Sequence, residues 1–139
     1  MEQAVFESVR YSAVCQECGA ELECWGTQAL VDARLRWDVE STCSACGAAA
    51  AICGGDVPAD RRDQMLSEHG PARLRVSSPS AEGVAIMRVL RAELGIDLIS
   101  AKAVMRRVAN GDYSGTLPEM EHLARKLRAR GISAVATRP

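Results

Sequence analysis

Four of the six cysteines in this 139-residue chain form two short motifs that can bind a metal ion. The motifs are Cys15-Gln-Glu-Cys18-Gly and Cys43-Ser-Ala-Cys46-Gly, and residues 19–42 lie between them. Two residues between thiolates let one tight turn present both sulfurs to an ion, and the following glycine permits a positive φ. The long spacer leaves room for a hairpin that brings the motifs together. The spacing predicts one structural Zn²⁺ held by all four thiolates.

The alternatives for these cysteines are two disulfides or free thiols in a core. The chain has no run of about 18 apolar residues and no apolar segment near its start, so we expect neither a membrane span nor a signal peptide. We therefore expect a cytoplasmic, reducing location. Under reducing conditions, Cys-x-x-Cys pairs favour metal binding over disulfides. Cys24 and Cys53 lie on expected strands. We expect small buried side chains at both, with a redox pair or another ligand set as alternatives.

The segments around the motifs carry a strand pattern. We predict strands at 21–28, 33–41 and 48–53, because apolar residues alternate there with polar ones. In the second strand, Leu35, Trp37 and Val39 share one face. We call each Cys-x-x-Cys-Gly motif a knuckle. The order of knuckle, strand, strand, knuckle and strand resembles a zinc ribbon, and the resemblance covers roughly residues 12–55.

The second half alternates between helical and extended patterns. Its predicted elements are a strand at 72–77, helices at 82–94, 97–109 and 116–131, and a strand at 132–137. Asp97 is expected to cap the second helix, and Thr116 with Glu119 to form a capping box for the third. The leucines and valine expected in the core are Leu90, Leu94, Val104, Leu123 and Leu127. The predicted domains are 1–55 and 72–139, with a helical linker at 56–71.

Residues 83–106, GVAIMRVLRAELGIDLISAKAVMR, resemble the C-terminal domain of the bacterial ribosomal stalk protein. The corresponding positions are Val84, Ala85, Arg88, Arg91, Gly95, Leu98, Ala101 and Lys102. The resemblance implies a β-α-α-β-α-β-like domain. The predicted fold class is therefore α+β, a small all-β zinc ribbon followed by a stalk-type domain.

In the stalk family the first two helices dock translational GTPases. Carried over by position, the implied partner-binding residues are Val84, Met87, Arg88, Arg91 and Lys102. Gly83 and Ile99 replace family lysines, and the family's dimerisation helices and hinge are absent. The chain therefore looks like a stalk-type domain reused in another protein. The alternative is that Val84 and Met87 are ordinary core and the arginines a solvated face.

The net charge of −1 hides an asymmetry between the halves. Residues 1–70 carry twelve Asp and Glu against five Arg, a net −7, and residues 71–139 carry six against twelve Arg and Lys, a net +6. An acidic zinc module argues against nucleic acid as the partner, because phosphate contacts need cationic side chains. The basic half would suit an acidic protein partner. The alternative is that the two halves neutralise each other.

No enzyme motif is present in the sequence. His69 and His122 are the only histidines, and neither stands near a plausible nucleophile. A four-thiolate site is closed to substrate. We therefore expect a non-catalytic interaction or adaptor protein that docks a protein partner. The alternatives are a nucleic-acid-binding regulator using the zinc ribbon and the arginine face, and a thiol redox sensor using Cys24 and Cys53.

Overall fold

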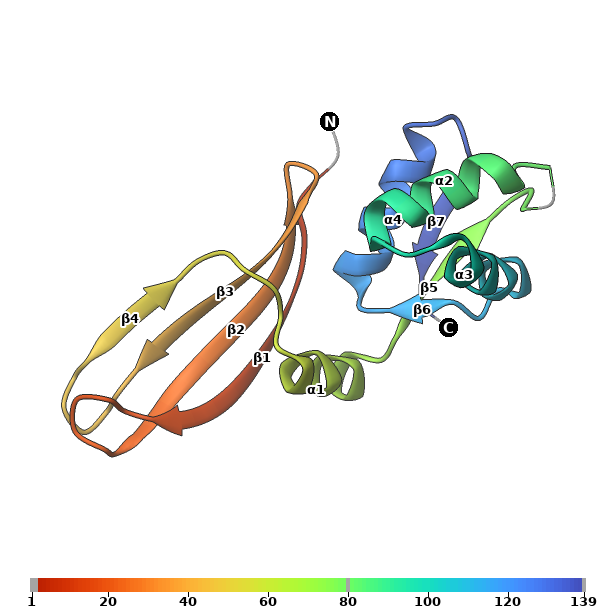
Figure 1. The fold of residues 1–139 in the computed structure, drawn as a ribbon. Helices are drawn as coiled ribbons and strands as arrows, with labels where there is room; N and C mark the ends of the chain where they lie inside the picture. Colours follow the sequence, from red (N-terminus) through yellow and green to blue (C-terminus); the bar gives the residue numbers. More distant parts are fainter. Residues whose placement is uncertain (1–2, 80, 139) are drawn as a thin grey trace. The chain divides into compact units, whose positions relative to one another are not determined.

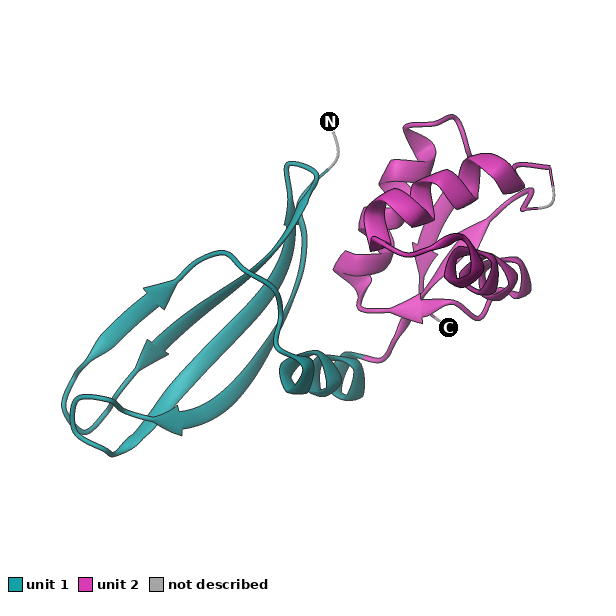
Figure 2. Cartoon of the chain, in the orientation of Figure 1, with its two compact units in different colours: residues 1–69 teal, residues 70–139 magenta. Residues whose placement is uncertain are grey.

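The chain divides between His69 and Gly70 into two units, each with its own antiparallel sheet (Figure 2). The computed structural model describes residues 3–79 and 81–138. The fold is mixed α+β, as predicted, with four helices in the described residues. None of these helices combines the length and the apolar character that crossing a bilayer requires.

The first unit is a four-stranded meander with the strand order β1-β2-β3-β4 (Figure 1). Its strands are β1 Val5–Val14, β2 Glu21–Val31, β3 Arg34–Thr42 and β4 Ala49–Ile52. The three predicted strands are confirmed as β2, β3 and β4, and β1 adds a strand that the sequence pattern did not indicate. Asp32 and Ala33 connect β2 to β3 with φ values of 50° and 64°, as a two-residue hairpin turn of the primed type requires.

One face of this sheet packs against helix α1, Ala59–His69. Val9, Trp37 and Met65 form the small core between them and are at most 6% exposed. The Trp37 ring lies over Gly26, where a Cβ atom would approach the ring to 2.2 Å. Gly26 is therefore required by space, because a larger residue would displace the indole from this core.

Helix α1 also covers the backbone edge of β1. The Gln64 side-chain amide donates to the Arg10 carbonyl at 2.8 Å, and His69 Nε2 lies 2.7 Å from the Ser8 carbonyl oxygen. Covering an edge strand in this way prevents it from pairing with another chain. The helix belongs with the first unit, whereas the sequence analysis placed it in a linker.

The second unit packs three helices on a small sheet with the order β6-β5-β7 (Figure 1). Its elements are β5 Ala72–Val76, α2 Gly83–Leu94, α3 Leu98–Asn110, β6 Ser114–Gly115, α4 Leu117–Arg128 and β7 Ala134–Thr137. The predicted helices and strands are confirmed, with ends that differ by up to about three residues. Leu74, Ile86, Leu90, Leu123 and Leu127 lie in one core and are at most 2% exposed.

The predicted caps are present in this unit. The Asp97 carboxylate accepts a hydrogen bond from the Ser100 N–H at 2.7 Å. Thr116 and Glu119 exchange the two hydrogen bonds of a capping box, which positions the start of α4. These contacts satisfy backbone donors at two helix starts, so the helix boundaries follow from local chemistry.

Two of the residues expected in the core lie differently. Leu94 is 37% exposed, and Val104 is only partly buried at the margin of the core. Leu94 occupies the last turn of α2, directly before Gly95 reverses the chain with a φ of 62°. The apolar stripe of the helix therefore continues beyond the elements that could cover it.

We predict that Glu121 gives the second unit a stability that depends on pH. Its carboxylate accepts hydrogen bonds from Arg125 at 2.7 Å and Arg128 at 2.9 Å. Burial would raise the pKa of Glu121, but the two guanidinium groups outweigh burial and hold the pKa below its ordinary value. The stabilisation is present above the unfolded-state pKa and is lost as pH falls through the lower folded-state pKa.

Glu121→Gln should therefore cost about 1–2 kcal/mol at pH 7 and progressively less in acid, because the wild-type carboxyl is then also uncharged. Urea unfolding at pH 7 and pH 3 measures both differences. Glu82→Gln is the control, since Glu82 makes no cap hydrogen bond at the start of α2. A loss of stability in Glu121→Gln that is the same at both pH values would contradict the role of the charged Glu121 carboxylate.

Candidate metal centre

The four cysteines of the two motifs meet at one end of the first sheet. Cys15 and Cys18 lie in the turn after β1, and Cys43 and Cys46 in the turn after β3. Their Sγ atoms all lie within 4.8 Å of one another. The Cys15–Cys46 and Cys18–Cys43 sulfur distances are 3.7 Å and 3.6 Å. No disulfide joins the six cysteines, so the predicted ligand set is brought together as free thiols.

The two knuckles have the same backbone geometry. The Gly19 N–H donates to the Cys15 carbonyl and the Gly47 N–H to the Cys43 carbonyl, each at 2.8 Å. Gly19 and Gly47 have φ values of 76° and 78°, which confirms the expected role of both glycines. A Cβ atom would meet no neighbour within 4 Å at either position, so the requirement is conformational rather than steric.

Backbone N–H groups point at the sulfurs and favour thiolates. The N–H of Cys46, assisted by that of Ala45, lowers the pKa of Cys43 to about 7. The N–H of Ala20 also lowers the pKa of Cys18, but hydrogen bonds to the neighbouring thiols outweigh it and raise that pKa to about 12. Four crowded thiolates repel one another, so full ionisation of the cluster requires a cation among them.

The cluster fits a soft metal ion with four sulfur ligands. Thiolates select Zn²⁺, Cu⁺ or iron–sulfur clusters over hard ions such as Mg²⁺ or Ca²⁺. A cation held by all four sulfurs in a tetrahedron has no open position for water or substrate. Cys15 and Cys43 are buried while Cys18 and Cys46 are exposed, so the ion would lie at the surface of the unit.

The remaining two cysteines lie apart from this cluster and from each other. Cys24 is 4% exposed, as expected for a small buried side chain, whereas Cys53 is exposed, contrary to that expectation. Cys24 lies on β2 and Cys53 directly follows β4, with β3 between them. The strand register places Cys53 three residues beyond the position opposite Cys24. Two strand spacings of about 9–10 Å and a further offset of about 10 Å along the strand therefore separate them, too far for a disulfide, which needs Cα atoms within about 7 Å.

The residues that the stalk resemblance assigned to partner binding lie on α2 and α3. Val84 is 72% exposed, Met87 is half-buried, and Arg88, Arg91 and Lys102 are exposed. Val84, Arg88 and Arg91 follow an i, i+4, i+7 spacing, so they form one stripe along α2. Val84 is therefore not a core residue, and the arginines line up with it.

The sequence analysis did not assign two exposed apolar residues at the start of α3 to this surface. Leu98 is 46% exposed and Ile99 is 80% exposed. Ile99 and Ala103 are four residues apart, so they share one side of α3, and both are exposed.

Three of the cations on these two helices form no salt bridge within the described residues. Arg88, Arg91 and Lys102 make no ion pair within residues 3–79 and 81–138. The nearby carboxylate of Glu93 instead pairs with His122 at 3.0 Å and with Lys126 at 3.9 Å. Arg88, Arg91 and Lys102 are consequently available to another molecule, whereas Arg107 of α3 pairs with Asp112 at 3.7 Å.

Comparison with protein-family models, with curated proteins and with solved structures finds no match for this chain. The resemblance to the stalk domain rests on the positions within residues 83–106, and that to a zinc ribbon on the two knuckles and their strands.

Proposed function

We propose that the protein is a non-catalytic, zinc-containing adaptor that docks a protein partner through α2 and α3 of its stalk-like second unit. The metal is structural in this proposal, and the surface of the two helices is the working site. The observation that carries the proposal is the coincidence of unpaired cations, Arg88, Arg91 and Lys102, with the exposed aliphatic side chains of Val84 and Ile99.

Zinc is the metal that best fits the cysteine cluster. Zn–S distances of about 2.3 Å in a tetrahedron place neighbouring sulfurs about 3.8 Å apart. The two shortest sulfur distances, 3.6 Å and 3.7 Å, are close to that separation. Zinc also does not change its oxidation state, and four-thiolate zinc sites stabilise small units that have small hydrophobic cores. The core of Val9, Trp37 and Met65 is such a core.

The α2–α3 surface favours a protein over a nucleic acid. Desolvating the aliphatic side chains supplies affinity, and the surrounding cations steer an acidic partner toward them. A nucleic-acid site would draw its affinity from phosphate contacts and would gain little from exposed Val84 and Ile99. Following the resemblance, the partner we propose is a translation-type GTPase.

The double change Arg88→Glu and Arg91→Glu should abolish partner capture while the melting temperature and zinc content stay unchanged. The test is a pull-down from the source cell, followed by association rates with a purified translational GTPase at several salt concentrations. The wild-type rate should fall with added salt, because screening weakens steering. Arg75→Glu with Arg130→Glu is the matched control, since both arginines are exposed outside the two helices.

Capture of every partner by the double variant would contradict the docking site. A loss of stability in the variant would instead indicate that the two arginines have a structural role. A steep salt-dependent affinity for RNA, lost in the same variant, would favour the nucleic-acid alternative.

A further inference from the structure

The face of the first sheet that α1 does not cover carries a second surface. We propose that this face binds an extended, arginine-bearing segment of a partner protein, in a trough along β2 that we call the Trp25 trough. The residues of the trough are Arg10, Glu21, Glu23, Trp25, Glu40 and Thr42. The proposal is independent of the α2–α3 surface, because the trough belongs entirely to the first unit.

The strand register places these side chains together. Arg10, Trp25 and Glu40 lie directly opposite one another on β1, β2 and β3, and residues paired across antiparallel strands share a face. The residues that alternate with these along each strand point to the other face, toward α1. On that face the Arg61 guanidinium lies 4.1 Å from the centroid of the Tyr11 ring. Within the described part of the first unit, no helix lies over the trough.

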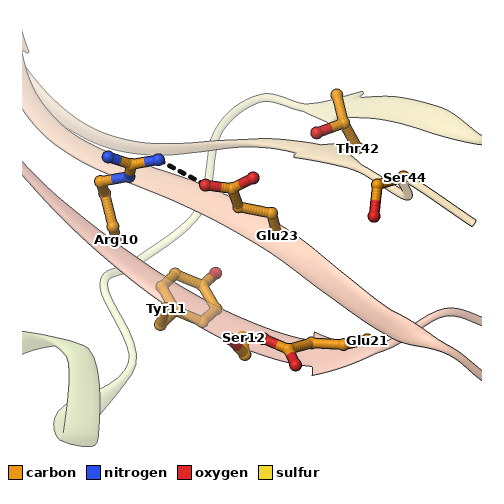
Figure 3. Close-up of a pocket in the computed structure, with 7 residues that line it drawn as sticks. All are labelled: Arg10, Tyr11, Ser12, Glu21, Glu23, Thr42 and Ser44. Atoms are coloured by element: carbon orange, nitrogen blue, oxygen red, sulfur yellow. Dashed lines mark hydrogen bonds and ion pairs between the residues drawn. The ribbon is translucent and has the colours of Figure 1, made fainter.

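The trough is an open hollow rather than a flat surface. Two depressions of about 520 Å³ and about 330 Å³ share Arg10, Glu23 and Thr42, so they adjoin each other along β2. Figure 3 shows the larger depression, with the Arg10 side chain extended toward Glu23. Trp25 lines the smaller depression and is 45% exposed, which leaves much of its indole open to a ligand.

The charge of the trough selects a cationic ligand. Three carboxylates, those of Glu21, Glu23 and Glu40, face the single cation of Arg10. Glu23 pairs with Arg10, and Glu21 accepts a hydrogen bond from Ser12. Glu40 makes no ion pair or side-chain hydrogen bond within the described residues. The half of the chain that contains the trough has a net charge of −7.

Arg10 shows how a guanidinium is held in this trough. Its guanidinium carbon lies 5.4 Å from the Trp25 ring centroid, within cation–π range, while a terminal nitrogen pairs with Glu23. A partner's arginine can make the same two kinds of contact, with the open indole and with Glu40. Arginine fits this combination better than lysine, because its planar group both stacks on an aromatic ring and pairs with a carboxylate.

The spacing of the two carboxylates that pair with no cation in the described part of the chain, those of Glu21 and Glu40, limits the partner segment. Glu40 lies opposite Trp25, and Glu21 lies four residues from Trp25 along β2. Four residues of a strand span about 13 Å. An extended segment with two arginines four positions apart would therefore place one near Glu40 and the other near Glu21.

The test uses the zinc-loaded full chain, labelled with ¹⁵N, and the peptide GSRGSGRSG as the probe. We expect the peptide to shift the indole N–H signal of Trp25 and not that of Trp37, which is only 6% exposed. Moving the arginines together, in GSRRGSGSG, should weaken binding several-fold. Replacing both arginines by glutamate should abolish it.

The double change Glu21→Gln and Glu40→Gln should weaken binding at least ten-fold, and Trp25→Ala should weaken it several-fold. The control removes two charges elsewhere, with Asp56→Asn and Asp63→Asn, since both residues are exposed outside the trough. An unchanged Trp37 signal in each variant verifies its fold. No shift at Trp25 with millimolar peptide would overturn the proposal. Equal weakening of peptide binding in the control variant would also overturn it, because only the net charge would then matter. Tighter binding of a nine-nucleotide oligouridylate than of the peptide would overturn it as well.

Discussion

Removing the metal should unfold the first unit and leave the second unit folded. Structural zinc contributes about 10–16 kcal/mol of apparent binding free energy in small zinc modules, which is far more than a three-residue core can replace. Without a cation, the Cys18 and Cys43 sulfurs, 3.6 Å apart, cannot both ionise, so no ion joins the two turns. A zinc chelator in reducing buffer should collapse the Trp25 and Trp37 indole signals while the signals of residues 70–139 persist.

The cysteines themselves provide a matched control for this prediction. Cys18 and Cys53 are both exposed, but only Cys18 belongs to the cluster. Cys18→Ser should reduce the metal content and unfold the first unit at 37 °C, whereas Cys53→Ser should change neither. Freshly purified, reduced protein without bound metal would disprove the assignment, and iron in place of zinc would correct the choice of ion.

The second large effect is expected in the core of the second unit. Leu90→Ala should destabilise this unit by about 2–5 kcal/mol, because Leu90 is fully buried and its truncation leaves a cavity. Leu94→Ala should cost less than about 1 kcal/mol, since this side chain is 37% exposed. Both residues belong to the same helix, so their difference in cost measures packing rather than helix propensity.

Thermal unfolding followed by the circular dichroism of the helices would measure both changes. The sequence pattern alone predicts similar costs for the two leucines, since it places both on the apolar stripe of the helix. Equal losses would therefore support that pattern and contradict the exposed position of Leu94. A large loss for Leu90 alone would support the packing described above.

The sequence by itself determined the features that depend on local chemistry. The two knuckles follow from cysteine spacing and from glycines at positive φ, and both are contained within about six residues of chain. The Asp97 cap and the Thr116 capping box likewise join atoms three residues apart. Such interactions depend on the neighbouring residues alone, so their pattern in the sequence was sufficient to predict them.

Only the tertiary structure decided which surfaces are covered. Strand β1 was not predicted, because a glutamate, Glu7, interrupts its inward-facing residues. In the structure Glu7 is nevertheless buried, opposite Gln28. Helix α1 reads as a linker until Met65 is seen to pack on Val9 and Trp37. Periodicity identifies an apolar stripe, but the burial of each residue on it depends on elements distant in sequence.

The candidate sites divide in the same way. The clustering of Cys15, Cys18, Cys43 and Cys46 could be predicted, because the identity and spacing of these residues already specify a candidate metal site. The exposure of Ile99 and the grouping of Trp25 with Glu21 and Glu40 could not, because residues from different elements are brought together only by helix packing or strand register. A one-residue change of register would move Trp25 to the other face of the sheet, so the trough exists only in the folded arrangement.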